Sequence, residues 1–243
     1  MRIQIINPNT TGTFTERLAL SAQAIVAPGT EVFATQPLLG TPSIESHTDE
    51  AWATLGVIAQ VQAGEASGVD AYVVACFGDT GVAAAREVAS GPVVGMTEAA
   101  LFSACLVAAT FSIITLPPRT LIHARRVLHE CGMHQRCAGL RAIDVLVDDC
   151  CEEDNAALYT ALLDEARIAL REDRSEALVL GCAGLSEMVE PLQRALGVPV
   201  IDGVNAAVKM AEGLVSLGLM TSKQNSFDFP PRDLRGQWPA LFA

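Results

Sequence analysis

The chain has 243 residues, of which 50% are hydrophobic and 18% charged, and its 16 basic and 28 acidic side chains give a net charge of −12. This length suits one large or two small domains with a sizeable core, and an acidic chain without basic clusters disfavours nucleic acid and anionic lipid surfaces as partners. The mean hydropathy is +0.33, but no uninterrupted apolar run reaches the roughly 18 residues of a membrane span.

Short β-branched runs alternate with Ala-rich stretches of helical period along the chain. The runs are almost continuously apolar, as in parallel strands that are covered by helices on both faces. This alternation predicts an α/β protein with parallel sheets. We expect strands at 3–6, 31–35, 71–75, 92–95, 111–116, 142–147, 177–180 and 199–201. We expect helices, among others, at 51–66, 120–131, 155–171 and 205–217.

An internal repeat divides the chain into two similar halves. Residues 70–76 (DAYVVAC) resemble residues 176–182 (EALVLGC), and the proline-led strand that follows each segment matches as well. The period is too long for a solenoid, so two α/β domains are expected. We place the first domain at 1–98 plus 205–243, where it includes a C-terminal helix and an extended tail, and the second at 99–204.

The seven cysteines do not indicate a disulfide framework. Their number is odd, and the chain opens on a strand-like run and not on an export signal, so we expect a reducing, cytoplasmic location. Most free cysteines are small buried hydrophobic residues, and each one therefore needs a local reason to be considered catalytic.

Cys76 and Cys182 have such a reason, because each closes an apolar strand and opens a glycine-containing turn into a helix. Ligands of open parallel sheets bind beyond the carboxyl ends of the strands. A helix N-terminus there offers unpaired N–H groups and partial positive charge, which favour a thiolate or an oxyanion. The repeat makes the two positions equivalent, so the two sulfur atoms are expected to approach one ligand from opposite sides.

That arrangement suits the inversion of a carbon acid beside a carbonyl group. One base removes the proton from one face and an acid returns a proton on the other face, and a thiolate and a thiol can exchange these roles. Turn amides can stabilise the intermediate enolate. We therefore expect neither a metal nor an organic cofactor.

Other motifs carry less weight. His129, Cys131, His134 and Cys137 are crowded enough to suggest zinc, but they lack the paired C-x-x-C of structural sites. Cys150 and Cys151 lie in an acidic run, 148–154, that is typical of a solvated loop. Glu45 and His47 are candidates for orienting a substrate. The alternative is that they are a pair of residues on the surface. No dinucleotide fingerprint or Walker motif occurs.

The segments 5–11 (IINPNTT), 75–79 (ACFGD) and 180–184 (LGCAG) resemble the hydantoin and allantoin racemases of the aspartate/glutamate racemase superfamily. The resemblance extends over nearly the whole chain. It implies two α/β domains with the active site in the cleft between them, a catalytic cysteine from each, cofactor-independent racemisation of a hydantoin ring, and often a homo-oligomer. Phe77-Gly78 stands where amino-acid racemases of the superfamily have Asn-Thr, which disfavours a substrate with an α-carboxylate.

Carried over by motif, the resemblance implies that Cys76 and Cys182 are the acid/base residues. The residues expected to present backbone amides to the ring are Phe77, Gly78, Ala183 and Gly184. The expected lining of the pocket comprises Pro8, Asn9, Ile44, Thr80, Gly81, Thr115 and Gly181.

Three other functions stay open at this point. One is an isomerase or decarboxylase of the same superfamily that acts on small dicarboxylates, although a decarboxylase needs only one of the two thiols. Another is a non-catalytic protein that binds a small molecule between its two lobes. The last is a redox sensor that uses a reversible disulfide between Cys76 and Cys182.

Overall fold

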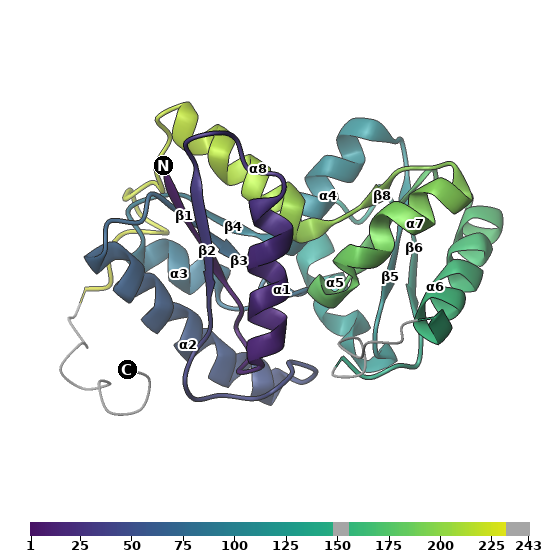
Figure 1. Cartoon of the computed structure of the whole chain (residues 1–243), viewed down its shortest axis with the longest axis horizontal. Coiled ribbons are helices and arrows are strands. Elements are labelled where there is room, and N and C mark those ends of the chain that lie inside the picture. Colours follow the sequence, from purple (N-terminus) through teal and green to yellow (C-terminus); the bar gives the residue numbers. More distant parts are fainter. Residues whose placement is uncertain (148–155, 232–243) are drawn as a thin grey trace. The chain divides into compact units, whose positions relative to one another are not determined.

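The computed structural model describes residues 1–147 and 156–231, which form two α/β units, each built around a parallel sheet (Figure 1). A unit is a set of segments that make most of their contacts with one another. The first unit contains Met1–Ala75, Asp79–Gly95 and the chain from Ala207 on, and the second contains Cys76–Gly78 and Met96–Ala206.

The first sheet has four parallel strands in the order β2-β1-β3-β4. Its strands are β1 (Arg2–Ile6), β2 (Glu31–Thr35), β3 (Ala71–Val74) and β4 (Val93–Gly95). The helices of this unit are α1 (Gly12–Gln23), α2 (His47–Ala66), α3 (Val82–Val88) and most of α8 (Gly203–Ser216).

The second sheet repeats this arrangement, with parallel strands in the order β6-β5-β7-β8. Its strands are β5 (Phe111–Thr115), β6 (Cys137–Ala142), β7 (Ala177–Gly181) and β8 (Val200–Ile201). The helices are α4 (Met96–Val107), α5 (Leu121–Glu130), α6 (Ala156–Ile168) and α7 (Ser186–Leu196), with the short helical turns η1 (Pro118–Thr120), η3 (Ala169–Asp173) and η4 (Ala183–Leu185).

The two sheets therefore share one strand order, in agreement with the two similar halves that the sequence repeat predicts, and the α/β class with parallel sheets is confirmed. In each sheet the chain runs outward from its first strand to one edge and then crosses to the other side. The carboxyl ends of β1 and β3, and of β5 and β7, are thus the two points where the winding reverses, which is where open parallel sheets bind ligands.

The predicted strand at 142–147 is wrong, because the strand in this region is β6, Cys137–Ala142. β6 is an edge strand that pairs only with β5. Because β6 is partly exposed at the edge of the sheet, it tolerates Gly139 and Arg141. These two residues interrupt the apolar pattern by which a strand is predicted from the sequence. Arg141 is held there by Asp173, whose two carboxylate oxygens accept hydrogen bonds of 2.7 and 2.6 Å from the guanidinium group.

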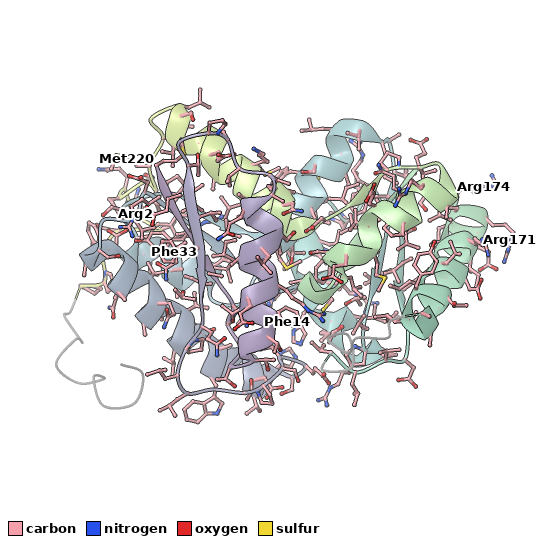
Figure 2. All side chains as sticks on the ribbon, viewed as in Figure 1. Arg2, Phe14, Phe33, Arg171, Arg174 and Met220 are labelled. Atoms are coloured by element: carbon pink, nitrogen blue, oxygen red, sulfur yellow. The ribbon has the colours of Figure 1, made fainter. Side chains whose placement is uncertain are left out.

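The inner strands β3, β5 and β7 are fully buried, and β1 is buried from Ile3 to Ile6, which accounts for their largely apolar sequences. In the first unit Ile3, Ile5 and Tyr72 are completely buried, and Gly64 lets α2 approach the ring of Tyr72. At the amino end of the same sheet Arg2 lies over the ring of Phe33, with 5.6 Å between the guanidinium carbon and the ring centroid (Figure 2).

The C-terminal segment returns to the first unit. Glu212 on α8 accepts hydrogen bonds from the Ala27 amide at 2.9 Å and the Thr30 hydroxyl at 2.7 Å. Lys223, beyond α8, donates to the carbonyl oxygens of Arg86 and Glu87 at the end of α3. The domain boundaries that we drew from the sequence stay a prediction, because contacts alone do not show that either unit folds independently.

Among the described residues, no helix combines the length and the apolar character that crossing a membrane requires.

Candidate active site

Both candidate cysteines follow the third strand of a sheet, at the point where its winding reverses. Cys76 comes after β3 and is half-buried, whereas Cys182 comes directly after β7 and is 9% exposed. None of the five described cysteines forms a disulfide. The equivalent placement that the repeat predicts is therefore present in the strand order and in the position along the strand.

Cys182 is the N-cap residue of the helical turn η4, which leads into α7. Ala183 and Gly184 are the first residues of that turn, and the first N–H groups of a helix have no acceptor within the helix. Ser186 donates its hydroxyl to the carbonyl oxygen of Ala183 at 3.0 Å and so fixes the turn. Dipole and N–H groups at this place favour negative charge on a thiolate or on a bound oxygen atom.

The segment that carries the first cysteine, Cys76–Gly78, makes most of its contacts within the second unit. The Gly78 amide donates to the Thr97 hydroxyl at 2.9 Å, and the Gly78 carbonyl accepts from Arg126 at 2.7 Å. Phe77 packs against the core cluster of this unit. Because the Gly78 amide already has a protein acceptor, it is not the donor for a ligand that the sequence suggests, and the amides of Phe77, Ala183 and Gly184 remain as candidates.

The ring of Phe77 also reaches the residue before the second cysteine. A Cβ atom on Gly181 would lie 3.0 Å from Cε1 of Phe77 and 2.6 Å from Cβ of Thr115. Thr115 is fully buried and donates its hydroxyl to the Gly181 carbonyl at 2.7 Å. Phe77, Thr115 and Gly181 are therefore brought together, and Thr115 supports the Cys182 turn through this hydrogen bond.

In the first unit, the turn after β1 presents Pro8 and Asn9. Asn9 is 6% exposed, and its Oδ1 accepts from Nδ2 of Asn7 at 2.8 Å and from the Thr11 amide at 2.9 Å. No hydrogen bond of the Asn9 Nδ2 group is found among the described residues. A carboxamide has two N–H donors besides its oxygen, so those of Asn9 are candidates for contact with a ligand.

The remaining first-unit candidates surround the starts of α2 and α3. Thr80 is buried, with its hydroxyl 3.4 Å from Oε1 of Glu50, and Oε2 of Glu50 lies 3.2 Å from Nδ1 of His47. Gly81 is the N-cap residue of α3 with φ of +79°, a left-handed conformation that favours glycine. Ile44 and Glu45 lie in the loop that precedes α2. Glu50 carries no signal in the sequence, because its burial arises from tertiary packing.

The zinc candidates do not form a cluster. The rings of His129 and His134 stack with their centroids 4.8 Å apart, but together with Cys131 and Cys137 they do not bring three ligand atoms within reach of one ion. Burial raises the pKa of the Cys137 thiol to about 11, and its Sγ donates to the Gly139 carbonyl. Cys150 and Cys151 lie outside the described residues.

These observations define a class, namely an α/β protein of two like-wound parallel sheets in which a cysteine follows the third strand of each sheet. Comparison with known proteins narrows this class. The model of the family described as Asp/Glu/Hydantoin racemase matches residues 3–211. The chain is 46% identical over 230 residues to a hydantoin racemase from Rhizobium meliloti, with 95% of each chain covered. It is 42% identical over 232 residues to a hydantoin racemase from Pseudomonas sp. (strain NS671), with 96% of this chain and 93% of that chain covered.

A solved structure agrees with these relatives. The allantoin racemase from Klebsiella pneumoniae superimposes with a TM-score of 0.95 at 51% sequence identity, covering 99% of this chain and 98% of that chain. The chain belongs to the Asp/Glu/Hydantoin racemase family and is an isomerase, a racemase.

Proposed function

We propose that the chain racemises a hydantoin ring, either allantoin or a 5-substituted hydantoin, by proton transfer between two cysteines, Cys76 and Cys182. The observation that carries the proposal is the pair of cysteines at equivalent strand ends of two like-wound sheets. The names of the relatives support the substrate class, since two are hydantoin racemases and one is an allantoin racemase.

The chemistry balances without an added reagent. The thiolate of one cysteine takes the proton from the ring carbon beside the carbonyl, so an S–H bond forms as the C–H bond breaks. The electron pair moves into the ring as an enolate. The thiol of the other cysteine then gives its proton to the opposite face of the same carbon and becomes the thiolate. The enzyme is ready for the reverse direction with its two cysteines in exchanged protonation states.

Main-chain and amide donors complete the proposed site. The amides of Ala183 and Gly184, at the start of η4, are suited to hold the enolate oxygen because donors fixed at developing charge lower the barrier. The Nδ2 group of Asn9 is suited to donate a hydrogen bond to a carbonyl oxygen of the ring. Pro8, Ile44, Phe77, Gly78, Thr80, Gly81, Thr115 and Gly181 complete the proposed lining.

The test measures racemisation and proton exchange of each enantiomer of allantoin and of alkyl- and aryl-hydantoins in heavy water. We expect wild-type protein to place deuterium on the ring carbon, and Cys76→Ala and Cys182→Ala each to lose racemisation. Cys105→Ala, a half-buried cysteine on α4, is the matched control and keeps the wild-type rate. Full racemisation by either active-site variant contradicts the proposal.

The same assays separate the other functions. Turnover of arylmalonates or maleate without turnover of hydantoins would indicate a decarboxylase or isomerase of dicarboxylates. Calorimetric binding of hydantoins without any turnover would indicate a binding protein, and a reversible disulfide between Cys76 and Cys182, found by mass spectrometry, would indicate a redox sensor.

We further propose a cytoplasmic homo-oligomer. Light scattering of the purified chain tests the oligomer, because a monomeric mass at working concentration contradicts it, and cell fractionation tests the location.

A further inference from the structure

The ends of β4 and β8 occupy equivalent places beside the strands that lead to the two cysteines. In the first sheet Val74 pairs with Gly95. In the second sheet Val179 pairs with Ile201, so the next pair in the same register is Leu180 with Asp202. Val74 and Leu180 each precede a candidate cysteine by the same number of residues. Gly95 and Asp202 are therefore equivalent positions, and each is followed directly by a helix, α4 or α8.

In the first unit a carboxylate occupies this place although the residue there is a glycine. A Cβ atom on Gly95 would overlap Cγ and both carboxylate oxygens of Asp79. Asp79 belongs to the turn that follows Cys76, and its φ of +51° places it in the left-handed region, which costs energy for a residue other than glycine. The missing side chain at Gly95 thus makes room for the Asp79 carboxylate.

In the second unit the strand end itself supplies the carboxylate. Oδ1 of Asp202 accepts hydrogen bonds from the amides of Val204 at 2.8 Å and Asn205 at 3.2 Å, at the start of α8. Its Oδ2 is buried and has no hydrogen-bond partner of ordinary length among the described residues. Burial raises the pKa of Asp202, whereas the amides of Asn205 and Val204 and the Ser186 side chain act in the opposite direction by favouring the charged form.

Ser186 lies beside both groups: its hydroxyl donates to the carbonyl oxygen of Ala183 at 3.0 Å, in the turn after the second cysteine, and its side chain is also close to the Asp202 carboxyl group. Each cysteine turn thus ends beside a carboxylate at the start of the helix that follows the neighbouring strand. A carboxylate is stabilised there by the helix dipole and the first amides. In the first unit the carboxylate comes from the turn after the cysteine, as Asp79. In the second unit it comes from the end of the neighbouring strand, as Asp202.

We propose that Asp79 and Asp202 are positioning residues for the racemase reaction, each holding the turn that carries one of the two cysteines. The inference rests on the proposed function, because it assigns a residue to each of the two proposed proton transfers. Neither carboxylate touches the ring. Each acts by fixing the turn whose thiol and amides face the substrate.

The test compares deuterium exchange of the two enantiomers in heavy water for Asp79→Asn and Asp202→Asn. Each aspartate is proposed to support proton removal by one of the two cysteines. Its loss is therefore expected to reduce the exchange of one enantiomer at least ten-fold more than the exchange of the other. The two variants are expected to show opposite preferences, with Asp79→Asn resembling Cys76→Ala and Asp202→Asn resembling Cys182→Ala. A merely structural role would lower the exchange of both enantiomers equally, which overturns the inference.

A second experiment moves the first carboxylate to the strand end, as in the second unit. Asp79→Gly removes the carboxylate, and Gly95→Asp places a second side chain in the space that the Asp79 carboxylate fills. Both single variants are therefore expected to racemise the substrate slowly. The double variant Asp79→Gly/Gly95→Asp is expected to recover at least ten-fold over each of them, with circular dichroism confirming the fold. A folded double variant no faster than the single variants overturns the inference.

The outcomes separate this inference from the proposed function. Wild-type racemisation by Cys76→Ala or Cys182→Ala defeats the proposed function. Inactive cysteine variants together with unchanged enantiomer preference in both asparagine variants defeat the positioning role alone.

Discussion

The ring of Phe77 lies against Gly181, so the residue after the first candidate cysteine touches the residue before the second. Both belong to the second unit, together with the buried hydroxyl of Thr115 that holds the Gly181 carbonyl. Two segments that are far apart in the sequence, and that each carry a candidate cysteine, are thereby fixed to one another.

Gly181→Ala is expected to disturb both cysteine segments. The new methyl group would lie 2.6 Å from Cβ of Thr115 and 3.0 Å from the ring of Phe77, so one of them has to move. We expect the rate of racemisation to fall at least ten-fold. The free energy of unfolding, measured with urea, is expected to fall by about 1–3 kcal/mol. In the control Gly213→Ala, on α8, a Cβ atom meets nothing within 4 Å, and both quantities should stay at or above wild type.

Arg126→Ala removes the donor to the Gly78 carbonyl, which is bonded at 2.7 Å. The free carbonyl and the loosened turn are expected to lower kcat/KM about ten-fold, while the unfolding free energy falls by about 1 kcal/mol. Arg126→Lys should recover part of the activity. Arg125→Ala, on the exposed face of the same helix, is the control, and a loss of activity equal to that of Arg126→Ala would contradict the role of this hydrogen bond.

Because of Cys137, the free energy of unfolding is expected to depend on pH in the alkaline range. Burial raises the pKa of its thiol to about 11 from 9.0, so the folded chain keeps a proton that the unfolded chain has released. The resulting stabilisation is complete below pH 9 and is lost as the pH rises toward 11, by about 2 kcal/mol or less. Cys137→Ala should show a smaller decline than wild type over this range in urea unfolding, and equal declines would contradict the assignment.

Arg141→Met is expected to destabilise the edge of the second sheet. Its guanidinium group contacts Asp173 twice and Glu165 at 3.0 Å, and its side chain is only 20% exposed. Leaving these carboxylates without their partner should lower the unfolding free energy by about 3 kcal/mol. Arg171→Met, which breaks an exposed pair with Glu172, is the control and should cost no more than about 1 kcal/mol.

The pH dependence gives this prediction a second readout. Arg141 lowers the pKa of Asp173 below its usual 3.8, so the stabilisation is present above that pH and disappears as the pH falls. Wild type and Arg141→Met should therefore converge in stability under acid conditions. A difference that stays constant down to pH about 2 would show that lost packing, not charge, causes the effect.

The sequence was sufficient for the parts of the fold that are locally encoded. Buried inner strands such as β3 and β7 are continuously apolar, and their repetition predicted two similar α/β halves with equivalent places for Cys76 and Cys182. The exception, β6, is an edge strand whose Gly139 and Arg141 are explained only by its exposure and by the acidic partner Asp173.

The supports of the candidate site could not be predicted from the sequence. The Gly78 amide was expected to face a ligand, but it is bonded to Thr97 on α4, a helix that is placed by tertiary packing. Arg126 on α5 has no sequence signal either, since an arginine on a helix is ordinarily a surface residue. Such contacts join segments that are distant in the chain, and no local pattern records them.

The glycine at position 95 and the aspartate at position 202 also bear on how the two halves are compared. Aligned letter by letter, the pair counts as a mismatch, and residue 79 aligns with a leucine, Leu185. In space, however, the same acidic group stands at both places. At position 95 a side chain and the acid at 79 exclude one another. Moving the carboxylate of the first half from the turn to the strand end therefore takes two substitutions together, and a comparison of the halves made one position at a time does not register the carboxylate that they share.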